Sequence, residues 1–289
     1  MGSTLGLQPL VIGLVLLAAL LHATWNAILK AAPDRLTTTG VMNLTGLVMG
    51  GLVLPFVAAP ASASWTYIGL SVAIHFGYFV FLLGSYRFGD LSQVYPLARG
   101  VAPLIVAFLS PWLIGESLGS LQLIGVVLLC VGILSLAFNQ LSLRQLLDWK
   151  PVSMALATGC TIAAYTVVDG LGVRASGSPG GYIAWLFIMD SATMALVATW
   201  VRGRGIGAAV KASWRPAVLS GVISMLAYGI VIWCYSLGAI APIAALRETS
   251  VVIAAAIGTM VLREPFGRWR ILAASFCAIG ILAINLPGR

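Results

Sequence analysis

Leu97-Ala98-Arg99-Gly100 and Ala245-Leu246-Arg247-Glu248 are the stretches that decide the fold, because each places an arginine inside a long apolar segment. A charge at membrane depth is costly, and its default interpretation is a functional site. The two arginines lie at matching places in the two halves of the chain. The sequence therefore predicts a duplicated membrane protein in which both arginines serve one pocket for an anionic group.

Composition agrees with a membrane protein. Of the 289 residues, 60% are hydrophobic and 8% are charged, and the mean hydropathy is +1.03. Soluble domains carry about 25% charged residues, so we expect lipid to be the solvent of this chain. The net charge of +8 is spread over short loops, which is typical of membrane orientation and excludes nucleic acid as the expected partner.

Ten apolar stretches of about 20 residues are each long enough to span a bilayer as a helix. They are approximately 9–31, 36–58, 66–88, 91–114, 119–139, 152–174, 180–201, 216–238, 240–262 and 268–287. One set of alternate loops holds most of the 16 lysines and arginines, and the opposite set has only Arg174 and Arg289. By the positive-inside rule, both termini are predicted to be non-cytoplasmic, in a multi-pass protein of the cytoplasmic (inner) membrane.

The halves repeat at an offset of 148 residues, since Arg99 precedes Glu116 by 17 residues and Arg247 precedes Glu264 by 17. Five spans lie on each side of a polar linker, and an odd number per half inverts one half relative to the other. We therefore expect a first five-helix repeat over 1–139, a linker over 140–151 and a second repeat over 152–289. Inverted repeats with a site near the midplane are a transporter architecture.

Breaks in helical regularity were expected beside both arginines. Pro96, Gly100 and Pro103 flank Arg99, and Pro242 precedes Arg247. Proline removes a backbone donor and kinks a helix. Irregular backbone at membrane depth is tolerated only where it lines a cavity or the protein interior.

Several motifs carry a family resemblance over essentially the whole chain. They are His22-Ala-Thr-Trp25-Asn26-Ala-Ile-Leu-Lys30, Tyr95-Pro96-Leu-Ala-Arg99-Gly100, Ala245-Leu-Arg247-Glu248-Thr249-Ser250, and the glutamates that precede the last span of each half. The chain resembles the drug/metabolite transporter superfamily, specifically its EamA-like members. That resemblance implies ten helices around a central substrate cavity and ATP-independent movement of small metabolites. Arg263 stands where the first half has Gly115, so the second glutamate motif is imperfect.

Arg99 and Arg247 are candidate substrate ligands, because the guanidinium matches carboxylate or phosphate in a bidentate manner. A structural salt bridge with Glu248 or Asp90 is the alternative. Glu248 is a candidate for a substrate amine or a coupling proton, although neighbours on a helix point about 100° apart, so Glu248 and Arg247 are not expected to face each other.

Other polar and aromatic residues complete the predicted site. His22, Trp25 and Asn26 are candidate substrate-binding residues, and His22 is also a candidate proton relay, with a helix–helix hydrogen bond as the alternative. Aromatic side chains are candidates to line the pocket, with packing or interfacial anchoring as the alternative; these are Tyr95, Tyr165, Trp185, Tyr228 and Trp233.

The remaining carboxylates are expected to have structural roles. Structure is favoured for Asp169 and Asp190, and the spacing of Asp169 and Arg174 permits a pair on one helix face. Capping or topology is expected to explain Glu116 and Glu264.

The leading hypothesis is a secondary transporter for a small anionic or zwitterionic metabolite, of the amino acid or organophosphorus class, working by alternating access. Protons or an exchanged metabolite are candidate coupling partners. The alternatives are an exporter of cationic drugs or amines and a flippase for lipid-linked phosphate. No catalytic motif is present, and His22 and His75 are the only histidines. No enzyme activity, cofactor or metal site is predicted, and Cys130, Cys160, Cys234 and Cys277 are expected to be buried, reduced thiols.

Overall fold

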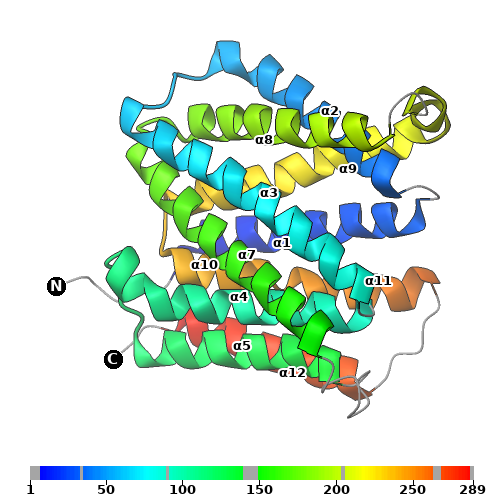
Figure 1. The fold of residues 1–289 in the computed structure, drawn as a ribbon. Coiled ribbons are helices and arrows are strands. Elements are labelled where there is room, and N and C mark those ends of the chain that lie inside the picture. The colour runs from blue at the N-terminus through cyan, green and yellow to red at the C-terminus, as the bar shows by residue number, and fades with distance from the viewer. Residues whose placement is uncertain are drawn as a thin grey trace.

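The chain folds into successive helices that cross the molecule in alternating directions (Figure 1). The computed structural model describes residues 7–32, 35–88, 91–138, 149–202, 206–262 and 268–286. The helices before the central linker are α1 (Pro9–Ala31), α2 (Arg35–Val53), α3 (Trp65–Phe88), α4 (Leu91–Leu113) and α5 (Ser120–Phe138), with short 3-10 turns at Leu54–Phe56 and Ser62–Ser64. Those after it are α7 (Trp149–Ala175), α8 (Pro179–Arg202), α9 (Ile206–Tyr235), α10 (Ile240–Arg247), α11 (Ser250–Leu262) and α12 (Arg268–Asn285).

The described helices have the length and composition of membrane spans. Nine helical stretches in the described ranges are long and apolar enough to cross a bilayer, and Trp269–Asn285 is a shorter apolar helix. No strand occurs within those ranges. The prediction of an all-helical, multi-pass membrane protein is confirmed at this level.

Two spans differ in detail from a single regular helix with the predicted bounds. The eighth span, expected over 216–238, corresponds to the apolar stretch Trp214–Tyr235, and α9 extends it back to Ile206 through Pro216. The ninth span, expected over 240–262, ends as α10 at Arg247 and resumes as α11 at Ser250, so its backbone is irregular beside the arginine as expected.

The interruption of the ninth span has a local cause other than Pro242. The amide and the hydroxyl of Thr249 both donate to Leu246 O, at 3.1 and 2.7 Å. Such a side-chain bond gives the backbone an alternative to the regular helix. The fourth span, in which prolines were expected to kink the helix, is one continuous helix, α4, that includes Pro96, Pro103 and Pro111.

Side-by-side helices from the two halves form the core. The most extensively packed pairs are α5 with α12, α3 with α7, α1 with α9, α2 with α8 and α4 with α7. Small residues permit this approach. A Cβ on Gly125 would lie 2.7 Å from Gly280 O, and one on Gly280 would lie 2.7 Å from Gly125 O. The two halves are therefore packed backbone to backbone along α5 and α12.

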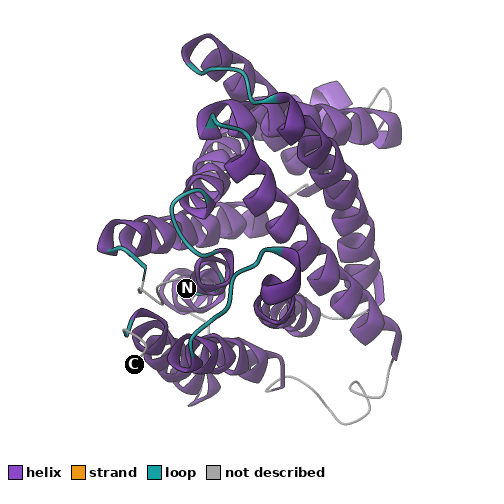
Figure 2. Cartoon of the chain, turned by 90° about the vertical axis from the view of Figure 1, so that its left-hand side faces the viewer, coloured by secondary structure: helices purple, strands orange, loops and turns teal. Residues whose placement is uncertain are grey.

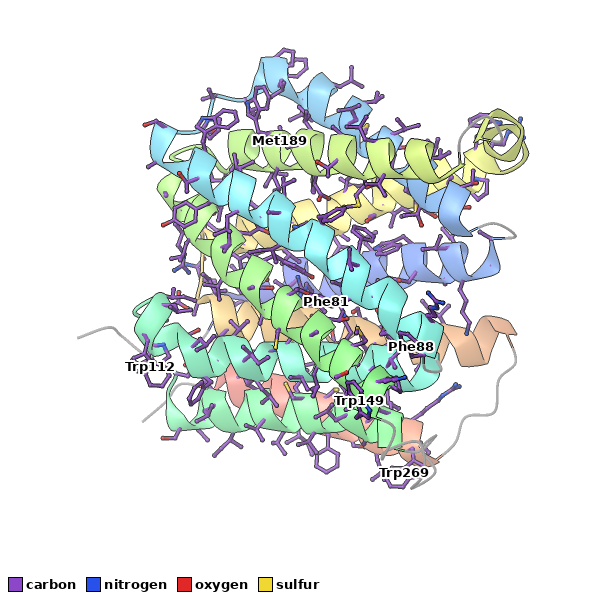
Figure 3. All side chains as sticks on the ribbon, viewed as in Figure 1. Phe81, Phe88, Trp112, Trp149, Met189 and Trp269 are labelled. Atoms are coloured by element: carbon purple, nitrogen blue, oxygen red, sulfur yellow. The ribbon has the colours of Figure 1, made fainter. Side chains whose placement is uncertain are left out.

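Both chain termini lie at one end of the helices, and short loops between helices also lie at that end (Figures 1 and 2). Aromatic side chains gather at both ends. Trp112 lies at the end that carries the termini, while Phe88, Trp149 and Trp269 lie at the opposite end (Figure 3). Tryptophan is enriched at both membrane–water interfaces. This placement agrees with helices that cross the bilayer from end to end.

The four cysteines are free thiols, and three of them, Cys130, Cys234 and Cys277, are buried as expected. Cys160 was expected to be buried and is exposed instead. It is on a helix, α7, whose apolar composition does not distinguish a lipid-facing side from a protein-facing side. Asp90, Arg263, Glu264 and most of the predicted linker lie outside the described residues.

Candidate functional site

Arg99 and Arg247 meet in the interior of the protein. Arg99 comes from the first half of α4, and Arg247 is the last residue of α10. Their exposed fractions are 3% and 4%, and Glu248, which follows α10, is fully buried at 0%. The helix pairs α4 with α10 and α1 with α10 bring these segments together. The two arginines, 148 residues apart in sequence, thus share one buried centre.

Glu248 binds both arginines. Its Oε2 lies 2.6 Å from Arg99 Nε, and its Oε1 accepts hydrogen bonds from Arg247 Nε and Nη2 at 3.1 and 2.9 Å. Charged groups removed from water need such paired and hydrogen-bonded partners. The structure therefore contains one carboxylate held between two guanidinium groups.

The expectation that Arg247 and Glu248 do not face each other was wrong. It assumed that both residues lie on one continuous helix. Glu248 lies at the C-terminal cap of α10, and its amide donates to Ala245 O rather than continuing the ladder of the next helix. At this break the long guanidinium side chain reaches the neighbouring carboxylate.

Arg99 has two further partners. Its Nη2 lies 3.1 Å from His22 Nε2 on α1 and donates to Ser250 Oγ on α11 at 3.3 Å. His22 Nδ1 accepts from the Trp25 indole at 3.3 Å, so that Trp25 orients the ring. The Asn26 amide donates to His22 O at 2.8 Å, a bond within its own helix.

The tyrosines divide between the two arginines. Arg99 Cζ lies 5.8 Å from the Tyr95 ring centroid, and Arg247 Cζ lies 5.9 Å from that of Tyr165. Rings within about 6 Å of a cation attract it through their π-faces. The Tyr228 ring packs edge-on against the Tyr165 ring, with ring centroids 6.0 Å apart.

Two predicted aromatic residues are not part of this centre. Trp233 is 41% exposed, on a side of α9 that faces outward. Trp185 packs edge-on against Trp65 at 5.1 Å. For these two, the alternative of packing or interfacial anchoring is the better description.

Asp169 forms a second polar centre, which the sequence analysis treated as structural. Its Oδ1 accepts from Tyr182 OH at 3.0 Å, and its Oδ2 accepts from Tyr228 OH. Gly172 leaves room for the Tyr182 ring, because a Cβ there would lie 2.5 Å from the tyrosine oxygen. The predicted pairing of Asp169 with Arg174 is therefore wrong.

Arg174 instead joins the two halves near the end that carries the termini. Its Nη2 lies 2.6 Å from Glu116 Oε1 and donates to Gly238 O at 2.7 Å, while its Nε donates to Tyr235 O at 2.8 Å. Glu116 Oε2 also accepts from the amide of Ile240 at 2.8 Å. Glu116 thus caps the start of α10, a helix of the other half, which its position in sequence did not reveal.

The sequence did not identify Ser71, His75 or Tyr182 as residues of a polar centre. It also did not identify Ser250 as a direct partner of Arg99. His75 was available as the second histidine of a membrane span, and Tyr165 lies four residues before Asp169 on the same helix. Without the tertiary structure, nothing in the sequence connected α3 with α7. Among the described residues, no group of three or more His, Cys, Asp or Glu side chains could hold a metal ion.

Comparison with known proteins identifies a family. Residues 9–138 match the sequence model of the EamA-like transporter family. A crystal structure described only as that of a protein has a TM-score of 0.74 and 16% sequence identity, with 97% of this chain and 96% of that chain covered. That likeness shows the fold alone, and no curated protein matches the sequence. Residues 9–138 are therefore similar in sequence to the EamA-like transporter family, which is part of the drug/metabolite transporter superfamily.

Proposed function

We propose that this protein is a secondary transporter that moves a small anionic or zwitterionic metabolite, and that Arg99 and Arg247 bind the acidic group. One observation carries the proposal: both buried arginines converge on a single carboxylate, that of Glu248. A pair of guanidinium groups that holds one carboxylate has the geometry to hold another, or a phosphate.

Charge supports binding of an anion at this centre. Two guanidinium groups face one carboxylate, so the centre retains one positive charge when Glu248 is ionised. An uncompensated charge is costly at membrane depth. The negative charge of a substrate acid, bound either beside Glu248 or in its place, would neutralise this positive charge.

Glu248 and His22 are the candidates for proton coupling. If Glu248 takes up a proton, it releases both arginines, and the substrate acid then meets two free guanidinium groups. A proton and an anion would bind together and be released together. His22 contacts Arg99 directly, so its protonation would oppose the arginine charge and weaken that arrangement.

Alternating access requires two related halves, and the packing supports an inverted 5+5 repeat. The pairs α3 with α7 and α4 with α7 have counterparts in α9 with α1 and α11 with α1, as exchange of the halves requires. A Cβ on Gly132 would lie 2.9 Å from Ala273 O. The 148-residue offset relates Gly132 to Gly280 and Gly125 to Ala273. The close pair Gly132–Ala273 therefore corresponds to the close pair Gly125–Gly280 with the two halves exchanged. Both pairs would be related by the same approximate two-fold axis.

The Arg174–Glu116 ion pair would act as a latch between the halves at one end of the pathway. Glu116 follows α4 and Arg174 belongs to α7, and Glu116 also holds the start of α10. Because Arg174 lies in the last turn of α7, beside a loop predicted to be non-cytoplasmic, we assign this latch to the non-cytoplasmic side of the inner membrane. Its opening would give one of the two access states.

The proposal is tested by thermal stabilisation of the purified protein with amino acids, phosphonates, phosphates and quaternary amines. A ligand that binds only the folded state raises the melting temperature by mass action. We expect an acidic or zwitterionic compound to stabilise the wild type, and Arg99→Ala and Arg247→Ala to abolish the shift. Arg215→Ala, a substitution of an arginine beside Trp214 rather than in this centre, is the matched control.

A response confined to quaternary amines, or one retained in both arginine variants, would overturn the anion site and favour the cation exporter. Stabilisation by lipid-linked phosphate but not by soluble acids would favour the flippase. The variant Glu248→Gln sharpens the result, because removal of the competing carboxylate should tighten binding of a substrate acid.

A further inference from the structure

The Asp169 centre has no part in the proposed anion site. Asp169 is fully buried on α7, and its carboxylate is bound by hydroxyls from α8 and α9. Ser71 and His75, on α3, lie beside it. Four helices of the protein therefore converge on one carboxylate at membrane depth.

Two titratable side chains lie near this carboxylate, His75 on α3 and Asp190 on α8. Among the described residues, no lysine or arginine lies within ion-pair distance of Asp169, and the nearest arginine in sequence, Arg174, binds Glu116 instead. Its direct ligands are hydroxyl groups. Acidic side chains within membrane spans normally pair with another charged group or mark a substrate or ion pathway. Asp169 thus has no lysine or arginine counter-ion, whereas the Arg99–Arg247–Glu248 centre has two guanidinium groups for one carboxylate.

Tyr165 separates the two centres. It precedes Asp169 by four residues on α7, so both side chains lie on the same helix face one turn apart. Its ring lies 5.9 Å from Arg247 Cζ and 6.0 Å from Tyr228, whose hydroxyl binds Asp169. The His75 ring stacks on the Tyr165 ring, with centroids 4.3 Å apart, and lies edge-on to the Tyr228 ring at 5.8 Å. Aromatic faces of this kind attract an organic ammonium.

We propose that Asp169 is an ammonium subsite and that the substrate is an elongated zwitterion. Its acidic group binds Arg99 and Arg247, its carbon chain lies along Tyr165, and its amine binds Asp169. The inference rests on the proposed function for the acid end. It replaces the expectation that Glu248 receives the amine, because Glu248 lies against two guanidinium groups, whereas the hydrogen-bond donors to Asp169 are neutral hydroxyls.

The arrangement also sets the length of the substrate. The amine must reach one helix turn, about 5–6 Å, beyond the side chain that contacts Arg247. In a simple α-amino acid the ammonium lies next to the carboxylate and does not reach Asp169. An amine on a chain of several methylenes does, as in 6-aminohexanoate or a diamino acid.

A purely structural network is the competing description. The Tyr182 and Tyr228 hydroxyls would then serve only to tie α8 and α9 to α7. That description predicts a loss of stability when Asp169 is changed, but no change in which ligands the protein prefers. Ligand preference is therefore the quantity to measure.

The experiment compares matched ligands on the purified full-length protein by calorimetry: hexanoate with 6-aminohexanoate, and acetate with glycine. We expect the terminal amine to strengthen binding of the six-carbon acid by about tenfold, as one ammonium–carboxylate contact beside aromatic rings provides. Glycine should gain nothing over acetate. In Asp169→Asn the amine advantage should fall to about twofold or less, with hexanoate affinity retained.

Two further variants keep the result decisive. Asp169→Glu retains the charge on a longer side chain, so the preferred ligand should shorten to 5-aminopentanoate, even if Asp169→Asn does not fold. Asp190→Asn makes the same chemical change on α8, where one carboxylate oxygen is buried without a hydrogen bond, and should keep the amine advantage. An advantage that survives Asp169→Asn, or that disappears in Asp190→Asn instead, overturns the assignment.

Failure of the proposed function is distinguishable from failure of this subsite. If the wild type binds neither acid, the arginine site is wrong, and hexylamine then tests Asp169 alone. Hexylamine binding that is lost in Asp169→Asn keeps the ammonium subsite without the anion site. Absence of hexylamine binding as well would reject the ammonium subsite.

Discussion

The fourth and ninth spans carry equivalent arginines but differ in the residue that follows. In α4, Arg99 is followed by Gly100, and the helix continues unbroken. In the ninth span, Arg247 is followed by Glu248, and the helix breaks before α11. One half therefore supplies an arginine alone, and the other supplies an arginine with the counter-ion for both. The site is therefore asymmetric, and the two spans differ in this respect at a single position, Gly100 against Glu248.

The space at the two positions explains why the carboxylate appears only once. A Cβ on Gly100 would lie 2.7 Å from Leu134 Cγ and 3.4 Å from Cys130 O, so α5 packs directly against it. Glu248, by contrast, lies at a break where its side chain can turn toward both guanidinium groups. The comparison leads to four predictions, from the largest expected effect to the smallest.

Removal of the shared counter-ion should have the largest effect. Glu248→Ala leaves two buried arginines that repel each other, and breaking a buried pair in this way costs about 3–5 kcal/mol of unfolding free energy. The melting temperature of the purified protein measures the loss. Glu248→Gln, which keeps hydrogen-bond acceptance, should lose less, and a bound substrate acid should restore part of the loss in both variants. An unchanged melting temperature of Glu248→Ala would show that Glu248 is not the shared counter-ion.

Removal of either arginine should affect binding more than stability. Arg99→Gln or Arg247→Gln leaves one arginine with one carboxylate, which is charge-balanced, so the expected stability loss is only about 1–3 kcal/mol. Affinity for the substrate acid should fall by about tenfold to a hundredfold, equivalent to one charge-assisted bond. Calorimetric titration measures this. If only one of the two variants lost affinity, the shared site would be contradicted and the anion would belong to one half.

Filling Gly100 should show that α4 has no room for a second side chain. Gly100→Ala is expected to destabilise the protein by about 1–3 kcal/mol through overpacking against Leu134. Gly77→Ala is the matched control, since a Cβ there meets nothing within 4 Å on a similar helix. The melting temperatures of the two variants are to be compared with that of the wild type. Equal effects would mean that Gly100 is set by helix propensity and not by packing.

Loosening the latch should have the smallest effect on stability. Glu116 and Arg174 are partly exposed, with side-chain exposures of 18% and 32%, so Glu116→Gln should cost about 0–1 kcal/mol. We expect a larger effect on the access of water-soluble reagents to this end of the pathway than on stability. In a Cys160→Ser background, a cysteine placed at the buried Ser176 should react faster with a water-soluble maleimide once the latch is weakened. An unchanged labelling rate would leave Glu116 as a helix cap only.

Several features of the fold could be predicted from the sequence. Apolar stretches of about 20 residues predicted the helical spans, because a backbone in lipid must satisfy its own hydrogen bonds. The exceptions are informative. Pro216 and the prolines of α4 lie inside helices that continue, whereas the break in the ninth span falls at Thr249, whose side chain competes with the helix. Proline alone was a poor guide to where the backbone becomes irregular.

The candidate site was predictable in part. Arg99, Arg247, Glu248, Tyr95 and His22 were all identified from their type and depth, and they lie together. Asp169 does not pair with Arg174, although the two are only five residues apart. Its partners are hydroxyls on distant helices, and Arg174 binds Glu116. Local spacing indicates which side chains can share a helix face, but it gives no information about the neighbouring helix.

By itself, the sequence determined that this chain resides in lipid, that it contains matching buried arginines, and that these need an anionic partner. Those conclusions follow from solvation, which depends on residue type and on the length of apolar segments. Only the tertiary structure decided that Glu248 serves both arginines, that Glu116 caps a helix of the other half, and that Asp169 is bound by hydroxyls of two other helices. These pairings depend on which helices pack side by side, and long-range packing selects partners that no local pattern specifies.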